Sequence, residues 1–305
     1  MHEGSKRAIF AAFIANLGIA GAKLIAALIT GSASMLAEAI HSFADTGNQG
    51  LLFLGGRRAA RPADEHHPFG YGAERFFWAF VVAMVLFTLG ALFSLYEGIE
   101  KLRTPHEVES PAVAFIVLGV AVVLESLSLR TAVREAAPHR GDLTWQRFIR
   151  NTKNPELPVI LLEDTGALAG LLLAIVGLAL AVVTDEPRYD AIGSIAIGVL
   201  LAVIAVALAI EMKSLLIGES ADSESAAGIR ATIDASPEVR GVIHLRTLQL
   251  GPEEVLVAAK LDFAVDDVAS LARAIDAVEL RIREHSPEAR VIYLEPDLDR
   301  SRTQT

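Results

Sequence analysis

His41 and Asp45 are the two residues of this chain whose types and spacing best suit chemistry. They lie four residues apart in the apolar stretch Met35–Gly55, which has the composition of a helix. This spacing places the imidazole and the carboxylate on one helix face, one turn apart. An ionisable group at membrane depth costs about 2.5–3.5 kcal/mol on insertion scales, so such groups usually have a function. A divalent cation offsets the cost, because imidazole nitrogen and carboxylate oxygen are both good ligands for zinc-like ions.

Glu163 and Asp164 form a second acidic pair in the later apolar stretch Val159–Val183. Neighbouring residues of a helix point about 100° apart, so at most one of them faces a shared cavity squarely. We expect Asp164 to be the ligand, and Glu163 to accept a proton or to pack between helices. The two pairs together predict a metal transporter, whereas a purely structural reading would have His41 and Asp45 only hold helices together.

The overall composition limits the class of protein. Hydrophobic residues make up 52% of the 305 residues, and the mean hydropathy is +0.44, too apolar for an ordinary soluble domain. The net charge of −10 and the lack of a long Lys/Arg run argue against a nucleic-acid partner. Cysteine is absent, so a metal site must use His, Asp, Glu, Asn or water.

Six apolar stretches are each long enough to cross a bilayer, which takes about 20 helical residues. They are residues Ala8–Ile29, Met35–Gly55, Phe76–Glu97, Pro111–Val133, Val159–Val183 and Ala191–Leu216. The sequence therefore predicts an α-helical membrane protein with six transmembrane helices in a transport domain of residues 1–218. We expect the first stretch to be a retained helix, because no convincing small-residue cleavage site follows it.

Positive residues predict the orientation of these helices. Eleven Lys and Arg residues fall on the side of the N-terminus and the even-numbered loops, and only Lys101, Arg103 and Arg188 fall on the other side. The positive-inside rule therefore places both termini in the cytoplasm. The compact loops, with no transit-like leader, favour a bacterial inner membrane.

Residues 219–305 have the composition of a soluble domain with a short polar tail. Ser223–Ile233 favours a helix, and Val239–Leu250 and Glu254–Phe263 favour two strands joined by Gly251-Pro252. An apolar stripe from Val268 to Ile282 has helical spacing, and Arg290–Leu294 suits a last strand. The order αββαβ predicts a small α+β domain with helices on one face of a sheet.

Three further charged residues lie within the apolar stretches. We expect Lys23 to reach the membrane surface or to pair with a carboxylate of a neighbouring helix. Glu38, one turn before His41, is a candidate either to orient that imidazole or to pair with Lys23. Glu125 has either a structural role or a place on a proton path.

Three motifs together resemble the cation diffusion facilitators. The stretch Ala37–Asp45 looks like the HxxxD motif of that family, His67-Pro-Phe-Gly-Tyr-Gly72 opens the third predicted helix, and Leu161-Leu-Glu-Asp164 lies in the fifth. With six helices and the αββαβ domain, the resemblance covers almost the whole chain.

The resemblance implies a homodimer that exports zinc or a similar divalent ion in exchange for protons, with ferredoxin-like cytoplasmic domains in contact. It also implies two transport ligands from the second helix and two from the fifth. Carried over, these are His41, Asp45 and Asp164, but the fourth position is Ile160, which cannot bind metal. Water, Glu163 or Asn16 is expected to fill the gap. Zinc is the first choice, and manganese, iron, cobalt and nickel stay open because such a site is less zinc-selective.

Two other regions are compared with metal sites of the same family. Asp64 and His67 match a secondary cytoplasmic site, but Tyr71 stands where a histidine is expected; His66 is a substitute, and a solvated loop is an equal alternative. In the C-terminal domain Glu295 remains, but Lys260 and Tyr293 occupy neighbouring positions. We therefore interpret this domain as a dimerisation element rather than a metal sensor.

Other functions give different expectations. An intramembrane hydrolase would need three firm ligands and a base, and the chain has no HExxH and no GxSxG motif. A metal-responsive receptor would bind metal without net flux. A transporter of organic cations would need an aromatic cage, which is missing beside Asp45 and Asp164. No resident cofactor is expected, since the metal is the cargo.

Overall fold

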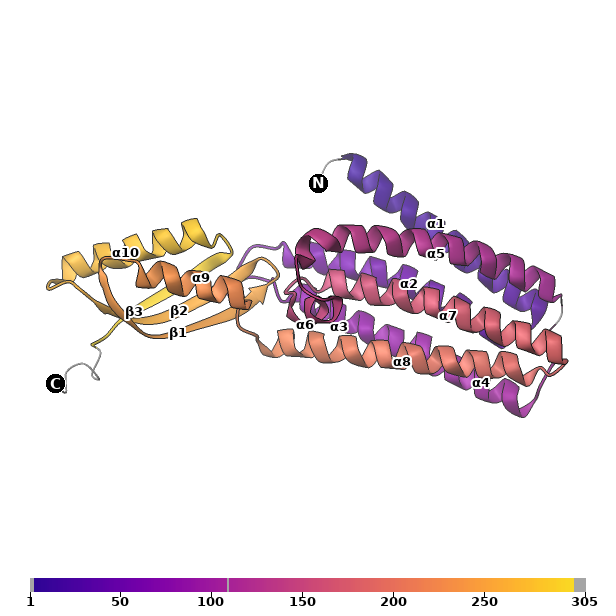
Figure 1. Ribbon diagram of the computed structural model, residues 1–305. Helices are drawn as coiled ribbons and strands as arrows, with labels where there is room; N and C mark the ends of the chain where they lie inside the picture. Colours follow the sequence, from indigo (N-terminus) through magenta and orange to yellow (C-terminus); the bar gives the residue numbers. More distant parts are fainter. Residues whose placement is uncertain (1–2, 109, 299–305) are drawn as a thin grey trace. The chain divides into compact units, whose positions relative to one another are not determined.

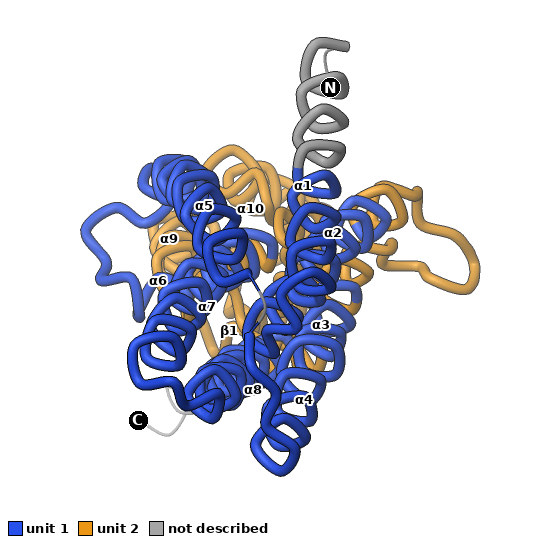
Figure 2. The backbone as a smooth tube through the Cα atoms, turned by 90° about the vertical axis from the view of Figure 1, so that its right-hand side faces the viewer, with its two compact units in different colours: residues 1–55, 78–149, 156–212 blue, residues 56–77, 150–155, 213–305 orange. Residues whose placement is uncertain are grey.

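The computed structural model describes residues 3–108 and 110–298, with side chains from Asn16 onward. The chain divides into two compact units, coloured in Figure 2. Unit 1 consists of residues up to 55, 78–149 and 156–212, and unit 2 of residues 56–77, 150–155 and 213 onward. The predicted domain boundary at residue 218 stays a prediction.

Long helices lie over all six predicted stretches (Figure 1). They are α1 (Glu3–Thr30), α2 (Ala33–Ala59), a continuous helix of α3 (Glu74–Val85), η1 (Leu86–Leu92) and α4 (Phe93–Arg103), α5 (Pro111–Arg140), α7 (Glu156–Thr184) and α8 (Arg188–Ile217). A short helix, α6 (Trp145–Asn151), lies between α5 and α7.

Four of these helices are long and apolar enough to span a membrane within the residues that the structure describes: Glu74–Arg103, α5, α7 and α8. In α1 the described apolar part is shorter, Asn16–Thr30, and α2 carries the polar residues of the candidate site. The chain is thus a multi-pass membrane protein, and the count of six spans stays a prediction. The third helix is longer than expected, so Lys101 and Arg103 belong to its last turn and not to a loop.

Glycines allow α8 to pack closely against α4. A Cβ added at Gly98 of α4 would lie 2.9 Å from the carbonyl oxygen of Ala191. A Cβ at Gly198 of α8 would lie 2.7 Å from Leu95 Cγ. Small residues at such crossings let two backbones approach, which is a main source of helix association within lipid.

A buried hydrogen-bond network around Asp190 ties together the ends of three helices. Asp190 is fully buried at the start of α8, where it accepts hydrogen bonds from Ser32 Oγ at 2.7 Å, from Ser34 Oγ and from the backbone N–H of Ala33 at 2.8 Å. Lys101 Nζ of α4 lies 3.3 Å from its second oxygen. The carboxylate therefore caps the first turn of α2, where a negative charge also complements the helix dipole.

Unit 2 contains the predicted αββαβ order as α9 (Ser223–Asp234), β1 (Val239–Gly251), β2 (Glu254–Phe263), α10 (Val268–His285) and β3 (Ala289–Pro296). The strand order is β1-β2-β3, with β1 antiparallel and β3 parallel to β2. Asp222 and Asp267 cap the two helices, each accepting two backbone N–H bonds. The element order was predicted correctly, and the ferredoxin-like assignment stays a prediction.

The core of unit 2 follows the alternation of β2. Val255, Val257, Ala259 and Leu261 are buried against α9 and α10, which cover one face of the sheet (Figure 1). Ile229 of α9 and Val278 of α10 are fully buried there. The opposite face carries the even-numbered residues of β2, because successive side chains of a strand point to opposite sides.

The Asp190 network gives a stability prediction. Asp190→Asn places an amide nitrogen among four donors, so we expect the transmembrane unit to lose about 3–5 kcal/mol of unfolding free energy, as for a broken buried ion pair. The matched control is Asp185→Asn, since Asp185 is exposed and has a φ of 54°, which asparagine tolerates. Thermal unfolding of both variants in detergent would measure the difference, and equal midpoints would show that the network does not hold the helices.

Candidate metal centre

A polar stripe on α2 contains the residues singled out by the sequence. His41 is fully buried, and its Nδ1 lies 3.5 Å from Asp45 Oδ1, whose side chain is 20% exposed. Asn48 follows one turn after Asp45 and is also buried. Sequence reasoning missed Asn48, although its spacing of three from Asp45 and seven from His41 puts it on the same face.

Several polar atoms of this stripe have no hydrogen-bond partner. Among the described residues, both ring nitrogens of His41, Asp45 Oδ1 and Asn48 Oδ1 are buried and unpaired. A buried polar group without a partner costs about 1–3 kcal/mol, so such a set demands an explanation. All of these atoms except one protonated ring nitrogen are electron-pair donors, which suits a dehydrated cation.

The two acidic residues of α7 form hydrogen bonds to different neighbouring helices. Glu163 is buried and accepts a hydrogen bond from Asn48 Nδ2 of α2 at 2.6 Å. Asp164 instead accepts one from Ser128 Oγ of α5 at 3.0 Å. Glu163, rather than the preferred Asp164, is therefore the residue of the pair that contacts α2.

Ile160 has an apolar environment of its own. It packs against a cluster of Ala132 and Ala136 of α5, Phe148 of α6 and Leu161. Ile160 and Asp164 lie one turn apart, and both contact α5. The isoleucine side chain has no atom that could bind a metal ion. A donor on this part of α7 must come from Glu163 or Asp164.

The described side chains are near one another without forming a complete coordination sphere. Asp45 lies within electrostatic range of Glu163, Glu125 and Asp164. However, no three His, Asp or Glu side chains in the described ranges lie close enough to hold a metal ion. Asn16, the other predicted fourth ligand, makes no hydrogen bond to this group within the described part of the chain. The ligand set therefore stays a prediction.

A π-helical segment of the third long helix faces the imidazole. A Cβ added at Gly90 of η1 would lie 3.9 Å from His41 Nδ1. Thr88 Oγ1 donates to the carbonyl oxygen of Met84 at 2.9 Å, within the turn that leads into this segment. Segments of π-helix inside α-helices frequently occur at functional sites. The apolar sequence Leu86–Leu92 contains no signal that would have predicted it.

Hydrogen bonds to the Asp64 carboxylate hold together the loop that was predicted as a secondary metal site. Asp64 accepts from the backbone N–H groups of His66 at 3.0 Å and His67 at 2.8 Å, and from Tyr71 Oη at 2.7 Å. The Tyr71 hydroxyl, followed by the backbone N–H of His67, lowers the pKa of Asp64 below its usual value. The Tyr71 hydroxyl thus binds Asp64 Oδ2, a carboxylate oxygen that a metal ion would otherwise use. The Arg61 guanidinium lies over the Tyr71 ring, 4.6 Å from its centroid.

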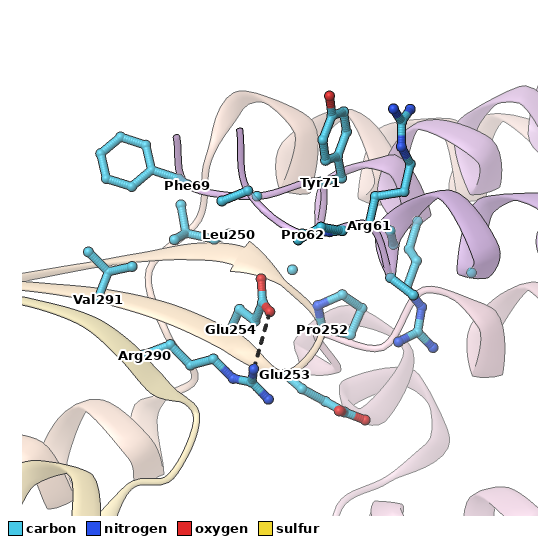
Figure 3. A pocket seen from close by; sticks show the side chains of 18 of the residues that line it. Arg61, Pro62, Phe69, Tyr71, Leu250, Pro252, Glu253, Glu254, Arg290 and Val291 are labelled. Carbon is cyan, nitrogen blue, oxygen red and sulfur yellow. Dashed lines mark ion pairs between the residues drawn. The ribbon is translucent and has the colours of Figure 1, made fainter. Parts of the chain in front are cut away.

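The same loop lines a cavity of about 570 Å³ with the β1–β2 turn (Figure 3). Its described lining includes Arg61, Arg75, Arg290, Glu253 and Glu254 and no histidine. Arg290 lies 3.8 Å from Glu254 across it. The guanidinium groups make this cavity unsuitable for a divalent cation.

Glu295 in the C-terminal domain is engaged by a lysine. Lys260 Nζ lies 3.0 Å from Glu295 and 3.1 Å from Asp297, and these contacts raise the pKa of Lys260. An ammonium group at this point repels a metal ion, and the interpretation of this domain as a dimerisation element rather than a metal sensor stays a prediction.

Comparison with known proteins relates this geometry to transporters. Residues 9–217 match the family model of the cation efflux transmembrane domain. The mitochondrial proton-coupled zinc antiporter SLC30A9 of Mus musculus is 34% identical over 244 residues, which are 79% of this chain and 43% of the antiporter. The chain thus spans less than half of the length of that curated relative.

Two further relatives are matched over more of their length. The metal tolerance protein C4 of Arabidopsis thaliana is 30% identical over 86% of this chain and 58% of its own. The cation-efflux pump FieF of Klebsiella pneumoniae is 27% identical over 96% of this chain and 94% of its own.

The hydrogen bond from Tyr71 can be tested by titration. Because it lowers the pKa of Asp64, Tyr71→Phe is expected to raise that pKa towards the usual value of about 3.9. The ionised carboxylate stabilises the loop above that value, and the stabilisation is lost as the pH falls through the lowered pKa. Carbon-13 NMR of labelled aspartate carboxyl groups in the full chain would measure the shift. An unchanged pKa in the variant would show that the hydroxyl does not bind Asp64.

Proposed function

The chain belongs to the cation efflux family, and on this premise we propose that it moves a divalent metal cation, first of all zinc, out of the cytoplasm in exchange for protons. The observation that carries the proposal is the set of buried, unpaired donor atoms of His41, Asp45 and Asn48. A dehydrated cation is the kind of partner that suits the electron-pair donors of this set, which are all of its atoms except the protonated ring nitrogen of His41. The name of the relative SLC30A9, a proton-coupled zinc antiporter, supports both zinc and protons.

We propose that His41, Asp45 and Asp164 bind the ion together with Glu163. Glu163 is favoured over Asn16 as the fourth ligand because Asn48 already holds it against α2. Asn48 then has a supporting role, since its amide fixes the orientation of a metal-binding carboxylate. Glu163, three residues after Ile160 on α7, thus supplies the ligand that Ile160 cannot provide.

Proton exchange follows from the chemistry of the ligands. Imidazole and carboxylate must be deprotonated to bind a metal, so loading the ion releases protons and protonation expels it. Alternating access would tilt helices about this group, which is near the middle of α2. With both termini in the cytoplasm, the ion leaves towards the opposite side. We place the protein in a bacterial inner membrane, supported by the bacterial pump FieF, which is 27% identical over 96% of this chain, although the relative SLC30A9 is mitochondrial.

We also propose that the chain works as a homodimer through its C-terminal domain. The sheet face opposite α9 and α10 carries Leu248, Leu256 and Val291 side by side. Tyr293 on this face is 58% exposed. Light scattering of the detergent-solubilised protein is expected to give twice the chain mass of 32.5 kDa, and a monomer at micromolar concentration would contradict it.

The transport site is tested by Asp45→Ala in proteoliposomes. Removing this carboxylate leaves His41 without its anionic partner, so we expect counterflow of labelled zinc to fall to the background while the protein remains folded. Asp142→Ala, at an exposed position, is the matched control. Parallel counterflow with manganese decides which ion is preferred.

Wild-type flux in the Asp45→Ala protein would rule out the site as proposed. Saturable zinc binding without flux in the wild-type protein would indicate a metal-responsive receptor instead of a transporter.

A further inference from the structure

Lys23 is a fully buried lysine in the middle of the helical unit. Its Nζ on α1 lies 2.6 Å from Ser42 Oγ and 3.4 Å from Glu38 Oε2, both on α2. Glu125 Oε1 on α5 lies 3.8 Å away. One ammonium group is therefore shared by carboxylates of two helices and fixed by a hydroxyl, which is more than simple pairing requires.

This cluster adjoins the proposed transport site. Glu38 precedes His41 by three residues, and Ser42 follows it directly. The charge of Lys23 acts electrostatically on both His41 and Asp45. Glu38 Oε1 is buried without a hydrogen-bond partner and lies against Gly170 of α7, where a Cβ would overlap it. The ammonium group of Lys23 thus lies beside the proposed ligands.

The charges around the proposed site determine how Lys23 affects metal binding. The carboxylates near the site belong to Glu38, Asp45, Glu125, Glu163 and Asp164. They attract a divalent ion strongly, because the surroundings have a low dielectric constant. Lys23 offsets part of this attraction, and its repulsion of a doubly charged ion is twice that of a singly charged one.

Transport requires an ion to bind well enough to enter and weakly enough to leave. We propose that Lys23 is a built-in counter-cation, which lowers the affinity of the transport site for its divalent cargo so that the cargo is released. The inference rests on the proposed transport function and assigns a residue that sets its affinity.

A charge role and a packing role predict opposite effects of mutation. If Lys23 only holds α1 to α2 and α5, then Lys23→Met and Glu38→Gln both disturb the site and weaken metal binding. If Lys23 repels the cargo, Lys23→Met strengthens zinc binding and Glu38→Gln weakens it. The double variant removes one charge of each sign, so its affinity returns close to that of the wild type.

The experiment is equilibrium zinc binding to the full chain in detergent, measured by competition with a chelating dye. We expect Lys23→Met to lower the Kd about tenfold, Glu38→Gln to raise it about tenfold, and the double variant to stay within about threefold of the wild type. Lys23→Arg keeps the charge and should bind zinc like the wild type. Lys213→Met, at an exposed position near the end of α8, is the matched control.

Zinc flux in proteoliposomes adds a kinetic readout. Tighter binding should lower the KM of Lys23→Met and also lower its maximal rate, because release becomes slower. Weaker zinc binding by a Lys23→Met protein that unfolds at the wild-type temperature would overturn the inference. If that variant does not fold, a double variant whose Kd differs more than tenfold from the wild type would overturn it.

The outcome is separable from the transport proposal. If the variants bind zinc with this order of affinities but the wild-type protein shows no zinc flux, the transport proposal is rejected and the charge effect of Lys23 is kept. Flux with any other order of affinities would reject only the role of Lys23.

Discussion

Charged and polar atoms buried between apolar helices must find partners, because an unpaired one costs free energy that the surrounding lipid and side chains do not return. Three such groups stand out among the described residues of unit 1. Asp190 has three hydrogen bonds and a lysine, and Lys23 has a hydroxyl and two carboxylates. Of these three, the stripe of His41, Asp45 and Asn48 has several atoms without a hydrogen-bond partner among the described residues. The contrast separates groups that stabilise the helices from the group that we propose binds the transported ion.

Local spacing accounts for what could be predicted from the sequence. His41 and Asp45 share a helix face because four residues make about one turn, and Lys23 pairs with Glu38 as one of the two expected alternatives. Alternating residues of β2 predict its buried face, and the helix from Val268 follows from its apolar stripe. Apart from the pair of Lys23 and Glu38, which are 15 residues apart, these features depend on neighbours within a few residues, which is the information that a single sequence carries.

Features that depend on contacts between distant helices could not be predicted. The sequence places Glu163 and Asp164 about 100° apart but does not say which of them meets α2, and the structure gives this contact to Glu163. Ile160 is a missing ligand in the sequence and part of an apolar cluster with α5 and α6 in the structure. Lys101 and Asp190 are 89 residues apart, so no local pattern joins them. Tyr71 was expected only as a departure from a metal-binding motif, but its hydroxyl donates a hydrogen bond to Asp64.

The π-helical turns at Leu86–Leu92 have a geometric consequence for the whole third helix. A π-turn holds one more residue than an α-turn, and one residue corresponds to a rotation of about 100°. All side chains after η1 are therefore out of phase with those before it. Ser94, Gly98 and Lys101 are buried in the later half, and Gly98 and Lys101 meet α8 there. The π-helical turns thus place Gly90, which has no side chain, beside His41, and set the rotation at which Lys101 reaches Asp190 along the same continuous helix.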